Sequence, residues 1–174
     1  MPDPIVVVDY DPQWPARFER LRARLAVALA DVAVTIEHAG STSVPGLAAK
    51  PTIDILVLLS SADQLPLAIR RLAAIGYAHE GDRGIEGREA FANPPGTGAH
   101  DHHLYVCPPG SAQFHDQVAF RDYLRANGDI ARAYGELKRD LAARFGRDRI
   151  GYTNAKADFV LEVLRRANQT ARNS

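Results

Sequence analysis

Apolar residues repeat with two different spacings along the chain, and the spacing changes close to residue 111. Apolar and polar residues alternate over residues 32–38 and 101–107, and residues 53–59 are apolar except for one aspartate. Alternation and short apolar runs predict β-strands, and a strand that is apolar on both faces belongs inside a sheet. From Ser111 onward apolar residues recur every three or four positions, which predicts helices. Strands followed by helices predict an α+β fold with a mixed sheet flanked by helices.

Turn and cap residues set the limits of the remaining elements. The chain, residues 1–174, is expected to form a single domain whose helical C-terminal portion spans residues 111–167. The other predicted elements are a helix from Asp11-Pro12, a helix over 65–75 that ends at Gly76, short strands over 77–80 and 88–93, a loop over 94–100, later helices capped by Asp129 and Thr153, and a frayed tail over 168–174.

A loop rich in glycine and serine lies between the first two predicted strands. Gly40 follows the first strand, Ser41, Thr42 and Ser43 come next, and Asp54 lies at the start of the apolar strand. Small residues let the phosphates of a ligand approach backbone N–H groups and hydroxyls, so the loop is a candidate phosphate site. The glycine spacing and the Gly-Lys-Ser/Thr ending of a Walker loop are absent. The same residue types also build ordinary surface turns.

Asp54 and Lys50 are the charged residues closest to this loop. A carboxylate in an apolar strand is costly to bury unless it is paired or binds a metal. Asp54 is therefore a candidate ligand for Mg²⁺ or Mn²⁺ that holds nucleotide phosphates, and a carboxylate that caps backbone amides is the alternative. Lys50 precedes a proline and is expected in an extended segment, where it balances Asp54 or a phosphate or is simply solvated.

A second cluster lies on the strand predicted over residues 101–107. Alternation puts Asp101, His103 and Tyr105 on one face, and His102 with its apolar neighbours on the other. The apolar face is expected to pack against the protein, so His103 is expected to face a cleft. It is a candidate metal ligand or proton carrier, and a hydrogen-bonded structural histidine is the alternative. His38, which ends the strand before the loop, is expected to orient the loop.

Composition mainly excludes certain partners and kinds of site. The 174 residues carry a formal net charge of zero, so the charge of the whole molecule gives no case for a nucleic-acid partner. The single cysteine excludes an internal disulfide and multi-cysteine zinc sites. No apolar run approaches membrane-spanning length and no secretory signal is recognised, which together predict a cytoplasmic protein without a membrane partner.

The loop and the strand after it are similar to the nucleotidyltransferase fold of the DNA polymerase β superfamily. In that superfamily a Gly-Ser on a short helical turn precedes a strand with two carboxylates one residue apart, and a neighbouring strand carries a third. Gly40-Ser41 and Asp54 match the first two elements, whereas Leu56 stands at the position of the second carboxylate. Because alternate strand residues share a face, Leu56 is expected to point at the cleft and to leave one metal position without its ligand.

The GrpB family is a closer resemblance, which runs from about Val8 to Arg166. That family also occurs as an extra domain on some dephospho-CoA kinases. It commonly has His-Leu-His where this chain has His103-Leu104-Tyr105. The resemblance implies a nucleotidyltransferase-like fold with a cleft over the sheet. Its motifs appear in order at residues 10–15, 38–54, 87–88, 102–106, 120–125, 134–138 and 152–156.

Residues and resemblance together predict a nucleotidyltransferase-like protein that binds a nucleotide or a related phosphorylated metabolite with a divalent metal. Transfer of a nucleotidyl group is the activity implied, although Leu56 leaves the metal carboxylates incomplete. The alternatives are a non-catalytic module that binds a nucleotide or a coenzyme A precursor, and a metal-dependent phosphohydrolase. The candidate residues are Gly40, Ser41, Thr42, Ser43, Lys50, Arg88, Arg121, Lys138 and Lys156 for phosphate, and Asp54 and His103 for metal and catalysis.

Overall fold

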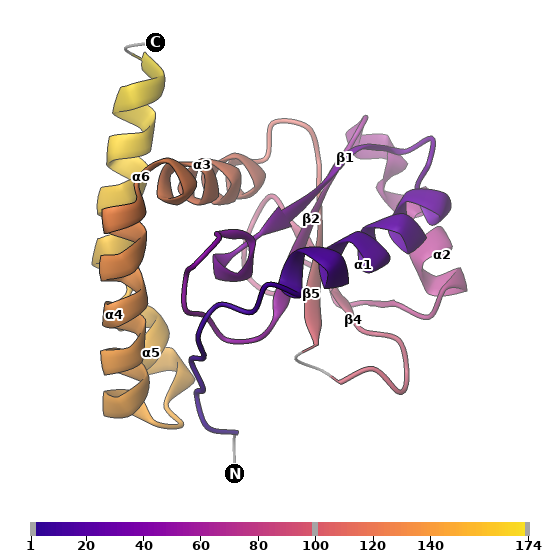
Figure 1. The fold of residues 1–174 in the computed structure, drawn as a ribbon. Helices are drawn as coiled ribbons and strands as arrows, with labels where there is room; N and C mark the ends of the chain where they lie inside the picture. Colours follow the sequence, from indigo (N-terminus) through magenta and orange to yellow (C-terminus); the bar gives the residue numbers. More distant parts are fainter. Residues whose placement is uncertain (1–2, 99–100, 173–174) are drawn as a thin grey trace.

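A mixed five-stranded sheet forms the centre of the molecule, and helices lie on both of its sides (Figure 1). The computed structural model describes residues 3–98 and 101–172. In chain order the elements are α1 (Trp14–Ala28), β1 (Ala33–Ala39), the 3₁₀ helix η1 (Ser41–Ser43), β2 (Ile53–Leu59), the 3₁₀ helix η2 (Ala62–Gln64), α2 (Leu65–Ala74), β3 (Ala78–His79), β4 (Glu89–Ala92), β5 (His102–Cys107), α3 (Ala112–Ala126), α4 (Gly128–Phe145), α5 (Arg149–Ala155) and α6 (Ala157–Arg172). The strand order is β1-β2-β5-β4-β3.

Strand β2 lies inside the sheet, as its apolar sequence predicts. It pairs antiparallel with β1 and parallel with β5, and the register places Ala39 and His103 on either side of Asp54. Directly paired residues of neighbouring strands project from the same face of a sheet. Asp54 and His103 therefore lie side by side on one face.

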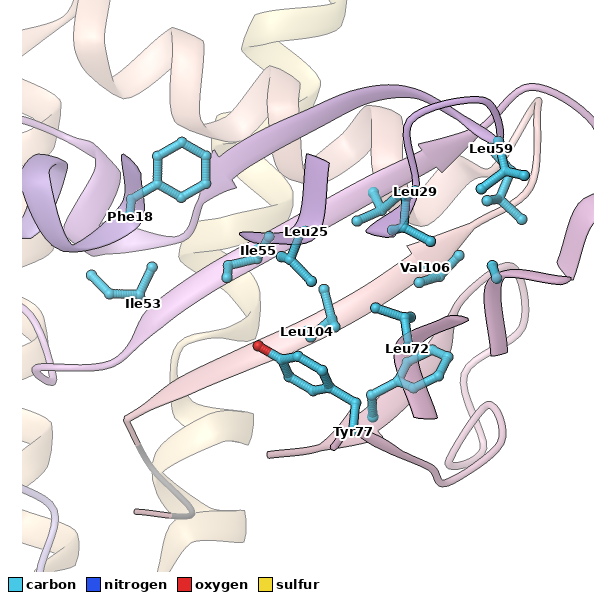
Figure 2. Close-up of a cluster of buried hydrophobic side chains, with 14 of the residues drawn as sticks. Phe18, Leu25, Leu29, Ile53, Ile55, Leu59, Leu72, Tyr77, Leu104 and Val106 are labelled. Carbon is cyan, nitrogen blue, oxygen red and sulfur yellow. The ribbon is translucent and has the colours of Figure 1, made fainter. Parts of the chain in front are cut away.

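One face of the sheet carries the main hydrophobic core and is covered by α1 and α2 (Figure 2). Burying one large aliphatic side chain contributes about 1.5–3 kcal/mol, so this face supplies much of the driving force for folding. We call it the packed face. Its buried residues include Phe18, Leu25 and Leu29 of α1, Ile53, Ile55 and Leu59 of β2, Leu72 of α2, Tyr77, and Leu104 and Val106 of β5.

The opposite face, which we call the cleft face, meets α3. Leu56 and Cys107 pack there against Phe114 of α3. A further cluster that includes Leu124 and Tyr134 joins α3 to α4 and α6. Figure 1 shows α4, α5 and α6 standing together beside the sheet, with α3 between them and the strands. This arrangement brings α4 and α5 next to the loop that follows β1.

The α+β fold with a mixed sheet is confirmed, as is the strand over residues 53–59. The predicted end of α2 is also correct: Gly76 adopts φ 97° directly after the helix. Residues 99–100, at the end of the loop predicted over 94–100, lie outside the described residues. In the described ranges no helix combines the length and apolar character that a membrane span requires.

Two predicted helix limits are wrong. Helix α1 begins at Trp14 rather than at Asp11, because the Asp11 carboxylate accepts the backbone N–H of Gln13 at 2.8 Å in the turn before the helix. Helix α6 continues to Arg172, so residues 168–172 are helical rather than a frayed tail. Gln169, Ala171 and Arg172 within this stretch are good helix formers.

Two predicted helix caps are also wrong. Asn127, and not Asp129, occupies the cap position of α4, and Asp129 lies in the first turn. Thr153 lies inside α5, which is capped instead by Asp148. The Asp148 carboxylate accepts the N–H of Gly151 at 2.9 Å. An acidic cap satisfies N–H groups that the first helical turn leaves without a partner.

Candidate functional site

The loop after β1 begins with a backbone conformation that glycine adopts readily. Gly40 has φ 67° and ψ −175°, and a Cβ at this position would overlap the carboxylate of Asp54. In the 3₁₀ turn that follows, Ser43 Oγ donates to the carbonyl of Gly40 at 2.5 Å. Thr42 Oγ1 donates to the carbonyl of Thr52 at 3.2 Å. Gly40 therefore allows the Asp54 carboxylate to lie directly against the loop.

His38 holds this loop from the end of β1. Its Nε2 lies 3.0 Å from Thr42 Oγ1, and its ring stacks on Phe18 with the centroids 4.7 Å apart. Because the Thr42 hydroxyl donates to Thr52, we assign the hydrogen of this contact to His38 Nε2. Burial lowers the pKa of His38 to about 4, so the ring is neutral near pH 7. This geometry is the one expected of a residue that orients the loop.

Two arginines of α3 hold the outer side of the same loop. Arg121 is buried and donates from Nη1 to Glu37 Oε2 at 2.7 Å and to the carbonyl of His38 at 3.0 Å. Arg125 donates from Nε and Nη2 to the carbonyl of Ser43 at 3.0 and 2.8 Å. These bonds tie α3 to β1 and to the loop, so both arginines act as structural clamps.

Asp54 and His103 form a hydrogen-bonded pair on the cleft face. Asp54 Oδ1 and His103 Nδ1 lie 2.9 Å apart, and the two side chains are 27% and 37% exposed. We assign the hydrogen to Nδ1, because an ionised carboxylate only accepts hydrogen bonds. The lone pair of His103 is then on Nε2. The pair has the groups needed to accept a proton or to bind a cation.

A cavity of about 240 Å³, which we call the lysine cavity, opens beside this pair. It lies between the loop, the segment that leads into β2, and helices α4 and α5. Hydroxyl, aromatic and cationic side chains line it together with Asp54 and His103. They are Ser41, Thr42 and Thr52, then Phe120, Tyr134 and Tyr152, and finally Lys50, Lys138 and Lys156.

All three lysines of the chain lie in the lining of this one cavity. The sequence has 21 lysines and arginines together, and only Lys50, Lys138 and Lys156 are lysines. Lys138 and Lys156 each follow a tyrosine by four residues, and their Nζ atoms lie 4.6 and 4.5 Å from the ring centroids of Tyr134 and Tyr152. Residues four apart share a helix face, so the two Tyr-x-x-x-Lys segments direct two cations into the cavity.

Lys138 is the most deeply buried cation of the cavity. It is 3% exposed, and its Nζ has no hydrogen-bond partner among the described residues. Burial, then the nearby charges of Lys156 and Lys50, lowers the pKa of Lys138 to about 7. Burial and then Lys50 likewise lower the pKa of Lys156 to about 8. An anion in the cavity would supply hydrogen-bond acceptors and offset this mutual repulsion.

Residues 4–166 match the family model described as GrpB protein. The chain belongs to the GrpB family. It resembles the crystal structure of the conserved protein GrpB from Enterococcus faecalis with a TM-score of 0.84 and 34% identity, covering 95% of this chain and 99% of that one. The UPF0157 protein of Halalkalibacterium halodurans is 36% identical over 166 residues, which are 95% of this chain and 84% of that protein.

Two more distant likenesses concern proteins named for an activity. The Cid1 poly(U) polymerase structure matches with a TM-score of 0.57 at 12% identity, covering 79% of this chain and 45% of that one. At this identity the likeness shows the nucleotidyltransferase-like fold alone. A dephospho-CoA kinase of Mycolicibacterium paratuberculosis is 29% identical in an alignment 190 positions long, which covers 94% of this chain and 46% of that enzyme. That likeness is confined to less than half of the kinase.

The cavity of this GrpB-family protein brings together most of the residues singled out in the sequence. Ser43, Arg88 and Arg121 do not line it. Ser43 closes the turn of the loop and Arg121 clamps α3, while the guanidinium of Arg88 lies 4.3 Å from the ring centroid of Tyr105. The predicted residues that line it are Gly40, Ser41, Thr42, Lys50, Asp54, His103, Lys138 and Lys156.

Two predictions about the cleft face are wrong. Leu56 shares the face of Asp54 but is fully buried against Phe114 of α3, so it does not reach the cleft. Asp101 precedes β5 and does not follow its alternation. Its carboxylate pairs with Arg17 of α1 at 2.8 Å and with His102 Nδ1 at 3.1 Å, beside the packed face. The expected inward position of His102 is correct, since it is 2% exposed.

The donor set for a metal is small. No group of three or more His, Cys, Asp and Glu side chains that could hold a metal occurs in the part of the chain that the structure describes. Asp54 and His103 offer one carboxylate and one imidazole. Mg²⁺ is commonly bound by one or two carboxylates, with phosphate oxygens and water completing the shell. The residues therefore fit a single ion that arrives with a phosphorylated ligand.

Sequence reasoning did not single out five residues of the lining, of which Ala49 is one. Tyr134 and Tyr152 form the rings beneath two lysines, and Phe120 and Thr52 complete the walls. The repeated Tyr-x-x-x-Lys spacing was a usable signal for the two tyrosines. The packing of α3 that brings Phe120 to the cavity has no such signal, because a phenylalanine at helical spacing is normally a core residue.

Proposed function

We propose that this protein binds a nucleotide or a related phosphorylated metabolite in the lysine cavity. The observation that carries the proposal is that all three lysines of the chain converge there, with Lys138 buried and, among the described residues, without a hydrogen-bond acceptor. Polyvalent phosphate supplies both the negative charge and the acceptor oxygens that this arrangement needs. The hydroxyl of Ser41, which lines the cavity, would add a hydrogen bond to the same phosphates.

The test is calorimetric titration of inorganic triphosphate into the parent protein and into Lys138→Met. Methionine keeps the length and packing of the side chain and removes the charge. The expected loss is about 1.5–3 kcal/mol of binding free energy, the usual contribution of a hydrogen bond to a charged group.

Arg139→Met is the matched control for this titration. It removes a positive charge from the adjacent position of α4, where Arg139 pairs with Asp9 outside the lysine cavity. Its affinity for triphosphate should stay close to that of the parent. Equal affinity of all three proteins, or no binding by the parent, would contradict the proposal.

A single Mg²⁺ or Mn²⁺ would enter this site with the ligand, held by Asp54 with His103. The ion would neutralise phosphate charge there. Asp54→Asn should therefore remove the gain in triphosphate affinity that Mg²⁺ gives the parent, with little change in melting temperature. Asp101→Asn is the matched control, because Asp101 pairs with Arg17 away from the cavity. A magnesium effect that survives in Asp54→Asn would assign the ion to other groups.

Group transfer from the bound ligand is a second candidate function, and the Asp54–His103 hydrogen bond favours it. With the ion held by Asp54 alone, His103 Nε2 would take the proton from an attacking hydroxyl or water as its oxygen bonds to phosphorus and the bridging anhydride oxygen leaves with the remaining phosphates. Only one carboxylate serves the metal here, so we expect binding with weak or absent turnover. Phosphorus NMR of MgATP with the parent and with His103→Gln tests this, and robust turnover lost in the variant would make transfer the main function.

A further inference from the structure

A second cavity of about 190 Å³ lies directly beside the lysine cavity. The two cavities share Lys50, Thr52 and His103 in their linings. A ligand that extends past His103 therefore enters the second cavity without crossing another layer of protein. The other walls of the second cavity are residues 3–6 of the N-terminal segment, Pro51 and Arg149.

Backbone hydrogen bonds hold the N-terminal segment in place as a wall. The N–H of Ile5 donates to the carbonyl of Gly146 at 2.8 Å, and Val8 pairs with Ala49 through two hydrogen bonds of 2.9 and 3.0 Å. Ile5 is 8% exposed, whereas the next residue, Val6, is 51% exposed. The anchored backbone turns Ile5 inward, and Val6 contributes an apolar side chain to the second cavity.

The two cavities differ in chemical character. Three lysines line the first, and only Lys50 among them also lines the second, where Pro4, Val6 and Pro51 add an apolar surface with the charged groups of Asp3 and Arg149 around it. Small-molecule sites usually occupy about 300–1,000 Å³, and the lysine cavity alone is about 240 Å³. A ligand with several phosphates and an organic group therefore needs both spaces.

We propose that the ligand spans the two cavities. Its terminal phosphates lie among the lysines, and its organic group packs against Pro4, Val6 and Pro51. The phosphate that joins the two parts lies over the shared wall, next to His103. This inference rests on the proposed function and defines the ligand class as a nucleoside 5′-polyphosphate, whose base and sugar combine apolar faces with hydrogen-bonding edges.

The test compares ligands with and without the organic group on a protein whose second cavity is filled. Inorganic triphosphate, ATP, GTP, CTP and UTP are titrated by calorimetry into the parent and into Val6→Trp. At least one nucleotide should bind the parent more tightly than triphosphate does. Val6→Trp should weaken the affinity for that nucleotide by about tenfold and leave the affinity for triphosphate within about twofold of the parent's.

Val27→Trp is the matched control, because Val27 is 83% exposed and lines neither cavity. It should leave every affinity unchanged. Arg149→Met alters the opposite wall and should give the same selective loss, so the test survives a folding defect in Val6→Trp. Melting curves accompany each variant.

Three results separate this inference from the proposed function. Failure of the parent to bind triphosphate contradicts the proposed function itself. Triphosphate binding without tighter binding of any nucleotide overturns only the two-cavity inference. The inference is also overturned if Val6→Trp binds the preferred nucleotide as tightly as the parent does, or if its affinity for triphosphate falls by as much as its affinity for the nucleotide.

Discussion

Two deeply buried polar side chains on opposite sides of the central sheet, His102 and Lys138, differ in how well they are hydrogen-bonded. On the packed face, His102 Nε2 lies 2.8 Å from the Tyr77 hydroxyl, and His102 Nδ1 lies 3.1 Å from the Asp101 carboxylate. On the cleft face, Lys138 is equally buried but has no hydrogen-bond partner among the described residues. Burying an unpartnered charge opposes folding. The contrast supports the proposal that the lysine cavity serves a ligand, whereas the packed face serves stability.

The largest effect on stability should come from a substitution that leaves an empty space in the core of the packed face. Leu104 of β5 is 1% exposed within the main core (Figure 2). Leu104→Ala should lower the free energy of unfolding by about 2–5 kcal/mol, the usual cost of deleting a buried leucine side chain. Urea denaturation measures this loss. Triphosphate affinity of the folded variant should match that of the parent, and a loss of affinity with full stability would reverse the assignment of the two faces.

Gly40→Ala should have an intermediate effect that reaches both stability and binding. Gly40 has φ 67°, and its new Cβ would displace the Asp54 carboxylate. A strained backbone of this kind costs about 1–3 kcal/mol. Gly46→Ala is the control, since Gly46 has φ 78° and a methyl group added there would meet no atom within 4 Å. Both variants should lose stability, and only Gly40→Ala should lose magnesium-dependent binding of triphosphate. Equal binding by the two would show that Asp54 is not needed there.

The smallest expected effect is a gain in stability. Lys138→Met should raise the free energy of unfolding at pH 7 by about 1 kcal/mol, because it removes an unsatisfied buried polar group. The folded state of the parent loses the Lys138 proton near pH 7, whereas an unfolded lysine keeps it to about 10.5. The parent should therefore gain stability from this group as pH rises through that window. Urea titrations at pH 7 and pH 9 test both points, and a destabilised variant would make Lys138 a structural residue.

Much of the sheet is predictable from sequence because its signals are local. The apolar run at residues 53–59 and the alternation at His102 and His103 fix the two strands and their faces. The Gly40-Ser41 turn and Asp54 are close in sequence, so their meeting follows from one loop. The family resemblance then supplies the fold in which these strands pair.

The parts that sequence could not supply depend on how distant helices pack. Whether Leu56 reaches the cleft is decided by α3, whose Phe114 covers it. Arg121 looks like any helical arginine until α3 is placed against β1, where it becomes a clamp rather than a lining residue. The burial of Lys138 likewise requires α4 and α5 to close over the loop. No local pattern encodes these contacts.

The central claim is that the lysine cavity binds an anion, and the pKa values of its lysines test this most directly. Protein labelled with ¹³C at lysine Cε should give three lysine signals, one for each of Lys50, Lys138 and Lys156, assigned with single Lys→Met variants. We predict that Lys138 titrates at about pH 7 and Lys156 at about pH 8. Saturating triphosphate should raise both pKa values. Lysines that all titrate near 10.5, with no response to triphosphate, would contradict the claim.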